Sequence, residues 1–244
     1  MWRVSVVHAD GSLRWQSRLQ QVAAKSLDIG SSTTRFLTSH EAFVKLGWQL
    51  ARLPTGIVFL GSGGLHHLSY HLILRQANRP LTVLVFDRHG DYLPAPPGYI
   101  SCGSWLLELL KQPRVIEIWL VGSESTLRPP ERLRLMSSRQ LDSALRDRGL
   151  KRRRVYVSID KDVLREADTD WGSGRLRLEW LLRWLGRLQD CCRLVGVDVC
   201  GETVPRGPWP SDAELQAIRR SEEINLALCE AVLKRSLVRT LRAS

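Results

Sequence analysis

The chain reads, from residue 84 onward, Leu84-Val85-Phe86-Asp87-Arg88-His89-Gly90-Asp91, an apolar run that closes in Asp-x-His-x-Asp. A β-strand places alternate residues on one face. We therefore expect Asp87 and His89, with Asp91 as a third candidate, to point the same way at the carboxyl end of a buried strand.

Two further stretches have the same form. Residues 56–60 are an apolar run that leads into Gly61-Ser62-Gly63-Gly64-Leu65-His66-His67, and residues 155–159 are an apolar run that leads into Asp160-Lys161-Asp162. Taken singly, each ending is commoner as a turn, a helix cap or a loop histidine. In open α/β sheets, however, sites form at the carboxyl ends of the strands. Together, the three stretches predict one shared site.

The side chains in these endings indicate a metal site without thiolate ligands. Four carboxylates and two imidazoles suit Mn²⁺, with Mg²⁺ or Fe²⁺ as alternatives, and do not suit structural zinc. Four negative charges packed together repel one another, and two divalent cations would cancel them. The expected ligands are His66, Asp87, His89, Asp91, Asp160 and Asp162.

These motifs resemble those of the arginase/agmatinase/formiminoglutamase (ureohydrolase) family, whose members are binuclear manganese enzymes. The family's Gly-Gly-Asp-His, Asp-Ala-His-x-Asp and Ser-x-Asp-x-Asp correspond here to residues 63–66, 87–91 and 158–162. The resemblance spans roughly residues 56–202. It implies that Asp87 and Asp160 bridge two Mn²⁺ ions, that His66 and Asp91 complete the shell of one ion, and that His89 and Asp162 complete the other.

The chain departs from the family pattern at three places. Where the family has a proton-transferring His-Gly, this chain has Cys102-Gly103. The candidate proton carriers are Cys102, Asp91 and a water, although an inert small residue at the start of a helix explains Cys102 equally well. The family's Asp-x-x-Glu, whose Glu binds the guanidinium, becomes Asp198-Val199-Cys200-Gly201-Glu202, which places Glu202 one residue late. A bulge at Gly201 would let Glu202 reach the site, so it remains a candidate catalytic residue. The loop at 167–174 also differs, and we expect it to shape specificity. Its candidates for holding a cationic or planar group are Asp168, Asp170 and Trp171, although a solvated turn explains them equally well.

Length and composition are those of an ordinary soluble protein. The 244 residues are 43% hydrophobic and 25% charged, which suits one α/β domain over residues 1–244. The absence of a long apolar run or signal-peptide pattern, with five cysteines that form no Cys-x-x-Cys pair, favours a cytoplasmic location and no membrane contact. The net charge of +11 suggests nucleic acid as a possible partner. The densest basic cluster, at residues 151–154, contains no nucleic-acid-binding motif, so we do not expect that partner.

These observations predict a three-layer α/β/α sandwich with a mostly parallel central sheet. We expect residues 25–38 to be a loop and residues 138–148 and 212–239 to be helices. The expected function is hydrolysis of a C–N bond in a small guanidino, amidino or related substrate, with two Mn²⁺ per chain as cofactor. The alternatives are an amide deacylase of the arginase/deacetylase superfamily and a non-catalytic metal-binding protein with a basic partner surface. A homo-oligomer is compatible with the sequence.

Overall fold

An eight-stranded sheet forms the middle of the molecule in the computed structural model, which describes residues 2–30, 35–146 and 149–233. The strands lie in the order β2-β1-β4-β10-β9-β5-β7-β8, and every neighbouring pair is parallel. Their bounds are Arg3–His8 (β1), Lys25–Asp28 (β2), Gly56–Gly61 (β4), Leu81–Phe86 (β5), Val115–Val121 (β7), Leu133–Met136 (β8), Arg154–Asp160 (β9) and Arg193–Cys200 (β10).

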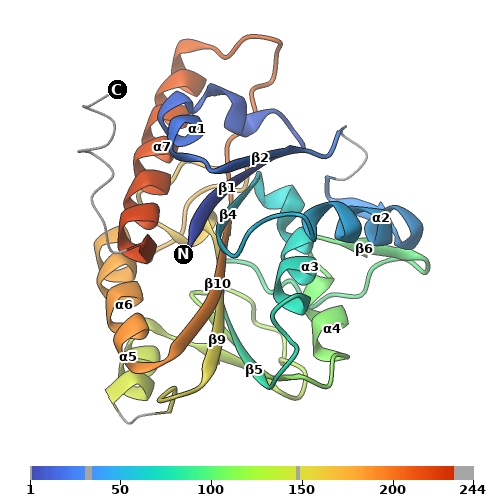
Figure 1. The fold of residues 1–244 in the computed structure, drawn as a ribbon, viewed down its shortest axis with the longest axis vertical. Helices are drawn as coiled ribbons and strands as arrows, with labels where there is room; N and C mark the ends of the chain where they lie inside the picture. The colour runs from blue at the N-terminus through green and yellow to red at the C-terminus, as the bar shows by residue number, and fades with distance from the viewer. Residues whose placement is uncertain (1, 31–34, 147–148, 234–244) are drawn as a thin grey trace.

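Helices cover both faces of this sheet (Figure 1). One face carries α1 (Ser17–Val22), α5 (Ser138–Arg146), α6 (Leu178–Cys191) and α7 (Asp212–Leu233). The other carries α2 (His40–Leu50), α3 (Ser69–Leu74) and α4 (Trp105–Leu110). The predicted three-layer fold with a parallel sheet is confirmed.

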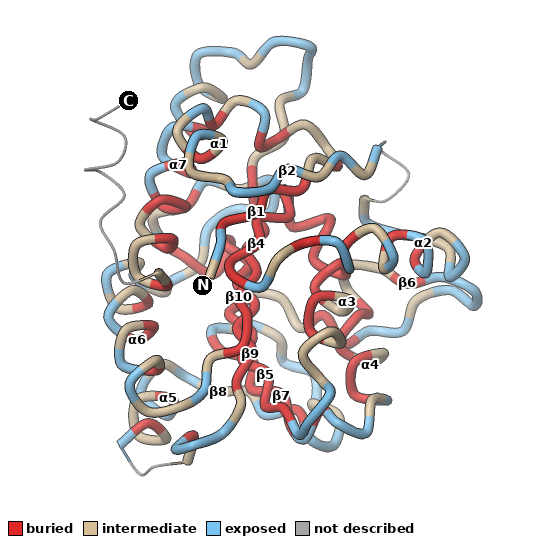
Figure 2. The backbone as a smooth tube through the Cα atoms, in the orientation of Figure 1, coloured by how far each residue is buried: buried red, intermediate tan, exposed pale blue. Residues whose placement is uncertain are grey.

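The apolar run of β5 shows why these strands are buried on both faces. Leu84 and Phe86 belong to the core beneath α5, α6 and α7, whereas Val83 and Val85 belong to the core beneath α2, α3 and α4. A strand that feeds two cores cannot alternate apolar with polar residues. Figure 2 shows the resulting band of buried backbone through the centre of the molecule.

The expected loop at residues 25–38 was wrong in part. Lys25–Asp28 forms β2 at the sheet edge, and Leu37–Ser39 forms β3, which pairs antiparallel with β6 (Tyr99–Ser101). Most side chains of β2 are exposed, so the strand leaves no hydrophobic pattern in the sequence. The predicted helices at 138–148 and 212–239 are present as α5 and α7, and residues 147–148 and 234–239 lie outside the described residues.

Among the described helices, none combines the length and the hydropathy that a membrane span requires.

Candidate metal centre

The three strands with polar endings terminate at the same edge of the sheet. β9 lies beside β5, and only β10 separates β9 from β4. His66 lies in the 3-10 turn Gly63–Leu68 after β4, Asp87 follows β5, and Asp160 ends β9. Asp162 lies in the next 3-10 turn, Lys161–Val163. Because the strands are parallel, their carboxyl ends meet, and the ligand-type side chains converge there.

One group of side chains surrounds the ring of His66. Nδ1 of His66 lies 3.0 Å from Oδ2 of Asp87 and 3.1 Å from Oδ2 of Asp91. Oδ2 of Asp160 lies 3.9 Å from the same nitrogen. The ligand atoms of His66, Asp87 and Asp91 therefore lie close enough together to hold one ion, and Asp160 lies beside the same histidine.

A second group surrounds His89 and shares Asp87 with the first. Nδ1 of His89 lies 2.6 Å from Oδ2 of Asp162 and 3.6 Å from Oδ1 of Asp87. The two carboxylate oxygens of Asp87 thus face different histidines. This is the geometry expected of a residue that serves two neighbouring cation positions.

The charges and unpaired buried atoms of these side chains are better satisfied by divalent cations than by one another. Burial, together with the charges of Asp162 and Asp87, raises the pKa of Asp160 to about 7. Nδ1 of His66 and Oδ2 of Asp162 are buried, and neither has a hydrogen-bond partner of suitable angle among the described residues. Cations would neutralise the carboxylates and coordinate these buried atoms.

Surrounding residues fix the orientation of the candidate ligands. Nε2 of His66 lies 3.0 Å from Oγ of Ser158, whose hydroxyl donates to Asp198 at 2.7 Å, and this leaves Nδ1 directed at the carboxylates. The indole N–H of Trp105 donates to Oδ2 of Asp91 at 2.8 Å. Such partners hold metal ligands in place before the ion binds.

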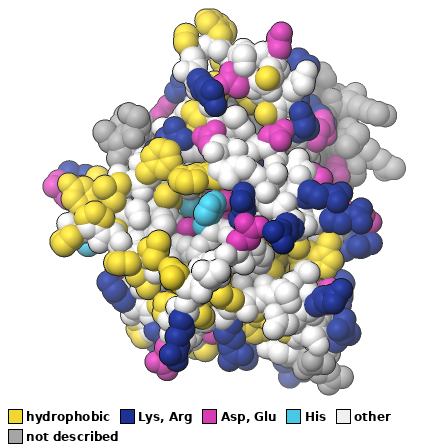
Figure 3. All heavy atoms as spheres, turned by 180° about the vertical axis from the view of Figure 1, so that it is seen from behind, with side chains coloured by type: hydrophobic (Ala, Val, Ile, Leu, Met, Phe, Trp, Pro, Cys, Tyr) yellow, Lys and Arg dark blue, Asp and Glu magenta, His cyan; other side chains and the backbone are white. Residues whose placement is uncertain are grey.

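A cavity of about 200 Å³ opens onto the two groups. Asp87, His89, Asp91 and Asp160 form its floor. The side-chain positions around them are mostly apolar, and the lining includes Tyr92, Leu93, Cys102, Ser125, Leu127 and Trp171. Figure 3 shows an exposed histidine near the middle of the face opposite the view of Figure 1, with hydrophobic side chains beside it. The ring of His89 is itself 43% exposed, so the site is accessible from solvent.

Comparison with curated proteins identifies an uncharacterized protein of Thermotoga maritima, 33% identical over 177 residues that cover 72% of this chain and 68% of the relative. The chain belongs to the family of this protein. No protein-family model matches the chain.

Several solved structures superpose on the chain over most of their length. A hypothetical agmatinase from Burkholderia thailandensis superposes with a TM-score of 0.65 at 17% identity, covering 100% of this chain and 88% of the agmatinase. Proclavaminate amidino hydrolase from Streptomyces clavuligerus gives 0.62 at 18%, covering 95% and 92%. Arginase from Bacillus subtilis gives 0.64 at 14%, covering 96% and 99%. The fold is the ureohydrolase fold in divergent form, and the resemblance expected from the motifs is confirmed at that level.

Within this ureohydrolase fold, Cys102 lines the cavity as a neutral thiol. Burial, with a contribution from the charge of Asp91, raises the pKa of Cys102 to about 12. Asp91 also lines the cavity, from a left-handed backbone conformation with φ of 54°. The two candidate proton carriers therefore lie at the site, one as a very weak acid and the other within the cluster of candidate ligands.

Glu202 does not line the cavity. Its carboxylate forms a fully buried ion pair with Lys161 and accepts hydrogen bonds from Gln16, Ser221 and Asn225. The structure therefore directs Glu202 into the protein interior, where an ammonium group of the chain already neutralises it. This differs from the role in guanidinium binding considered from the sequence.

Of the three candidate residues in the loop at 167–174, one lies at the cavity. Trp171 lines the cavity, with its ring centroid 5.4 Å from that of His89. Asp168 instead pairs with Arg220 at 3.0 Å, and Asp170 pairs with Arg35 at 3.1 Å. Both carboxylates are engaged by arginines of the chain itself and lie outside the cavity lining.

Sequence reasoning missed several residues of the site. Cys200, whose thiol donates to Oδ2 of Asp160 at 3.4 Å, forms a third potential ligand group with His66 and Asp160. Tyr92, Leu93 and Leu127 line the cavity without any motif to mark them. Tyr92 and Leu93 directly follow Asp91, and this adjacency was the one available signal.

Proposed function

We propose that the chain is a metal-dependent hydrolase that cleaves a C–N bond of a small substrate. The observation that carries this proposal is the pair of ligand groups that share Asp87 at the floor of an open cavity. The proposed cofactor is two Mn²⁺ per chain. His66 and Asp91 would serve one position, His89 and Asp162 the other, and Asp87 and Asp160 both.

Two bound divalent cations would supply a water of lowered pKa and polarisation of the scissile group. The protein contributes orientation and partial exclusion of water. Ser158 keeps Nδ1 of His66 free for coordination, and Trp105 holds Asp91. The apolar walls lower the local dielectric, which strengthens every charge interaction at the floor.

A leaving nitrogen requires a proton when the C–N bond breaks. A thiol with a pKa of about 12 is too weak an acid to supply it efficiently at neutral pH, which disfavours Cys102. Asp91 lines the cavity and accepts the indole N–H of Trp105. We assign proton transfer to Asp91, either directly or through a water.

Two substrate classes are compatible with this chemistry. The names of the similar structures, an agmatinase and an amidino hydrolase among them, favour guanidino or amidino compounds. The engagement of Glu202 by Lys161 favours the second class, amides, because it removes a carboxylate that could bind a guanidinium.

The test is a substrate screen on manganese-loaded protein, with metal content measured in parallel. We expect about two Mn²⁺ per chain, and release of urea from guanidino compounds or of a carboxylic acid from amides. Two bound metals without turnover of any compound would contradict the proposed hydrolase and support a metal-binding protein without catalysis.

The variant Asp160→Asn identifies the source of that activity. The amide oxygen can still accept the backbone N–H of Asp162, which now donates to Oδ1 of Asp160 at 3.0 Å, but the negative charge is lost. We expect loss of at least one metal and of activity. Asp212→Asn, in the exposed first turn of α7, is the matched control and should retain both. Full metal content in Asp160→Asn would contradict the assigned ligand role.

A further inference from the structure

No charged side chain in the described lining of the cavity is left free to bind a substrate. Every carboxylate in its described lining, namely Asp87, Asp91 and Asp160, belongs to the candidate ligand set, and the described lining contains no lysine, arginine or glutamate. Cations bound at the floor would engage these carboxylates. A charged substrate tail would therefore meet no opposite charge along these walls.

Gly201 occupies the position that corresponds to the glutamate of the family's Asp-x-x-Glu, and it leaves no room for a side chain. It is the third residue after Asp198, and it has a φ of 90°. A Cβ atom built on Gly201 would lie 2.4 Å from Oδ1 of Asp160 and 2.7 Å from the backbone nitrogen of Lys161. No side chain fits there without displacing a candidate ligand. The next residue, Glu202, turns inward to Lys161.

The polar atoms on the walls are largely occupied by the protein itself. The hydroxyl of Tyr92 lies 2.7 Å from Oγ of Ser125 and donates to the carbonyl oxygen of Leu127 at 2.9 Å. This pairing leaves the ring of Tyr92 as its contribution to the cavity. A substrate therefore meets mainly carbon.

An exposed apolar rim continues the cavity to the surface. Leu93 is 56% exposed, Leu127 is 50% exposed and Trp171 is 41% exposed, and all three line the cavity. Phe36, 44% exposed, packs edge-on against Trp171 with ring centroids 5.9 Å apart. Figure 3 shows a histidine near the middle of the face that it displays, with hydrophobic side chains on one side of it and Lys/Arg and Asp/Glu side chains on the other. Contiguous exposed apolar surface next to a site marks a surface for binding an apolar group.

Hydrogen bonds fix this rim in place. Arg88 donates from Nη1 to the carbonyl oxygens of Trp171 and Ser173, at 3.3 and 3.4 Å, and from Nε to Glu124 at 2.9 Å. The backbone N–H of Cys102 donates to the carbonyl oxygen of Phe36 at 3.0 Å. A rim tied to the residues that flank the candidate ligands is preorganised for binding.

From these observations we propose that the substrate is an uncharged carboxamide in which an apolar acyl group adjoins the scissile C–N bond. This inference rests on the proposed hydrolase function and specifies its substrate class. In the reaction, the oxygen of one water forms a bond to the carbonyl carbon and the C–N bond breaks with its electron pair on nitrogen. The nitrogen takes up a proton, and the products are an amine and a carboxylic acid. No redox partner is required.

The test compares amides and guanidino compounds on manganese-loaded protein. The amides are anilides of acetic, butyric and phenylacetic acid, and the guanidino compounds are agmatine, arginine and 4-guanidinobutyrate. We expect kcat/KM to rise about tenfold or more from the acetyl to the phenylacetyl compound, because burial of added carbon stabilises the bound state. We expect turnover of the guanidino compounds to be slower than that of every anilide. Faster turnover of a guanidino compound would overturn the substrate class while leaving the hydrolase function standing.

The variant Leu127→Asp tests the rim directly, since its exposed position tolerates a charge. It should lower kcat/KM for the phenylacetyl anilide about tenfold or more without changing the metal content. Val44→Asp, at a 50% exposed position on α2 outside the cavity lining, is the matched control and should behave as the wild type. Equal activity in Leu127→Asp and Val44→Asp would overturn the proposed role of the rim.

A binding measurement separates the substrate class from catalysis. Phenylacetamide should raise the thermal unfolding midpoint of the metal-loaded protein, and agmatine should not. This rise should be absent in Leu127→Asp and present in Val44→Asp. If no compound is hydrolysed, the hydrolase function fails. The binding measurement then tests the ligand class by itself. Stabilisation by agmatine and not by phenylacetamide would contradict the proposed apolar, uncharged class.

Discussion

At the scale of single residues, Asp87 is the side chain on which the site depends most. Its two oxygens face two different histidines, and its backbone position, directly after β5, fixes both directions. Oδ1 also accepts the N–H of His89 at 2.6 Å, which holds the carboxylate in place. The candidate ligands could be identified from the sequence because they lie in motifs that directly follow apolar strands.

Cys102 offers a prediction about pH. Burial and the nearby charge of Asp91 raise the pKa of the Cys102 thiol to about 12, so the thiolate is scarce at neutral pH and increases with pH up to that value. In metal-free protein at about pH 8, we expect alkylation of Cys102 to be about tenfold or more slower than that of an ordinary thiol with a pKa near 8.5, because the scarcity of the thiolate outweighs its higher nucleophilicity. Peptide mapping by mass spectrometry measures the rate at this residue. Labelling at the ordinary rate would show that the pKa of Cys102 is not raised.

Three residue assignments could not be made from local sequence. Asp170 is neutralised by Arg35, and Asp168 by Arg220, and both arginines lie far away in the chain. Glu202 lies four residues after Asp198, close enough to suggest a family role. The left-handed turn at Gly201, however, directs it away from the cavity. Such outcomes depend on long-range partners that local sequence does not reveal.

At the scale of elements, a buried ion pair joins three segments behind the candidate metal centre. Lys161 from the turn after β9 meets Glu202 after β10, and Ser221 and Asn225 of α7 bond to both. Both charges are almost fully buried. The pair therefore ties the segment that carries Asp160 and Asp162 to the longest described helix.

Removing one partner of this pair should be costly. Lys161→Met leaves the Glu202 carboxylate buried without its cation, and we expect a loss of about 3–5 kcal/mol in the free energy of unfolding. The double variant Lys161→Met, Glu202→Gln removes both charges and should lose less than the single variant. Denaturant unfolding in the presence of a chelator measures both values without the contribution of metal. Equal losses would contradict a net charge-pair interaction.

The elements predicted best were those with long apolar runs. The strands β4, β5 and β9 and the helix α7 follow from hydrophobic pattern alone, because burial on both faces or along one face dictates their composition. The edge strand β2 and the three-residue strands β3 and β6 were missed. Most side chains of β2 are exposed, and β3 and β6 are only three residues long, so pairing with neighbouring strands, which local sequence does not show, decides their conformation.

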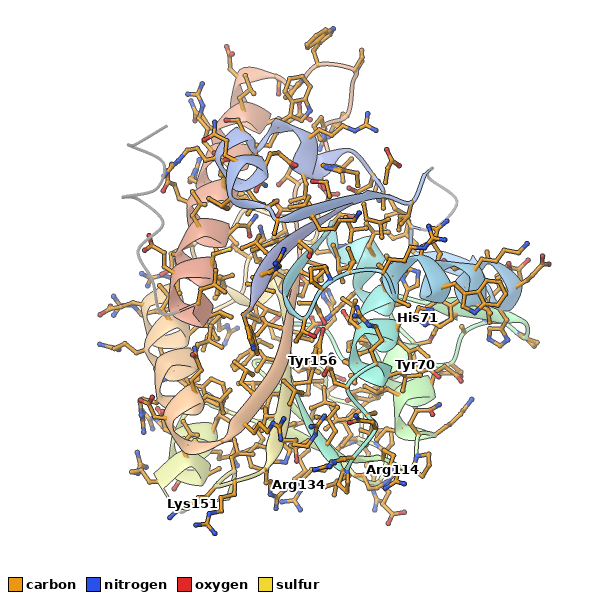
Figure 4. All side chains as sticks on the ribbon, viewed as in Figure 1. Tyr70, His71, Arg114, Arg134, Lys151 and Tyr156 are labelled. Carbon is orange, nitrogen blue, oxygen red and sulfur yellow. The ribbon has the colours of Figure 1, made fainter. Side chains whose placement is uncertain are left out.

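At the scale of the whole molecule, the parallel sheet separates a basic edge from the candidate metal centre. Figure 4 labels Arg114, Arg134 and Lys151 at one end of the molecule, where β7, β8 and β9 begin, whereas the candidate ligands lie where strands end. Part of this charge is paired internally, since Arg134 and Arg153 both contact Glu117. Arg114 and Lys151 therefore add positive charge at the end of the sheet opposite the candidate ligands.

This arrangement predicts weak, unspecific attraction for polyanions. We expect a dissociation constant for duplex DNA no tighter than about 10⁻⁶ M near physiological salt, with a steep loss of affinity as salt increases. Fluorescence anisotropy over a salt series measures this. Affinity tighter than about 10⁻⁸ M that distinguishes sequences would show that nucleic acid is a genuine partner.

The most direct test of the account is electron paramagnetic resonance of the protein titrated with Mn²⁺. Side chains from three strand ends that share Asp87 should hold two ions close enough to couple magnetically, so the spectrum at two equivalents should be that of a spin-coupled pair. Asp87→Asn should abolish the coupled signal. A spectrum of isolated ions in the wild-type protein at full loading would contradict a shared centre.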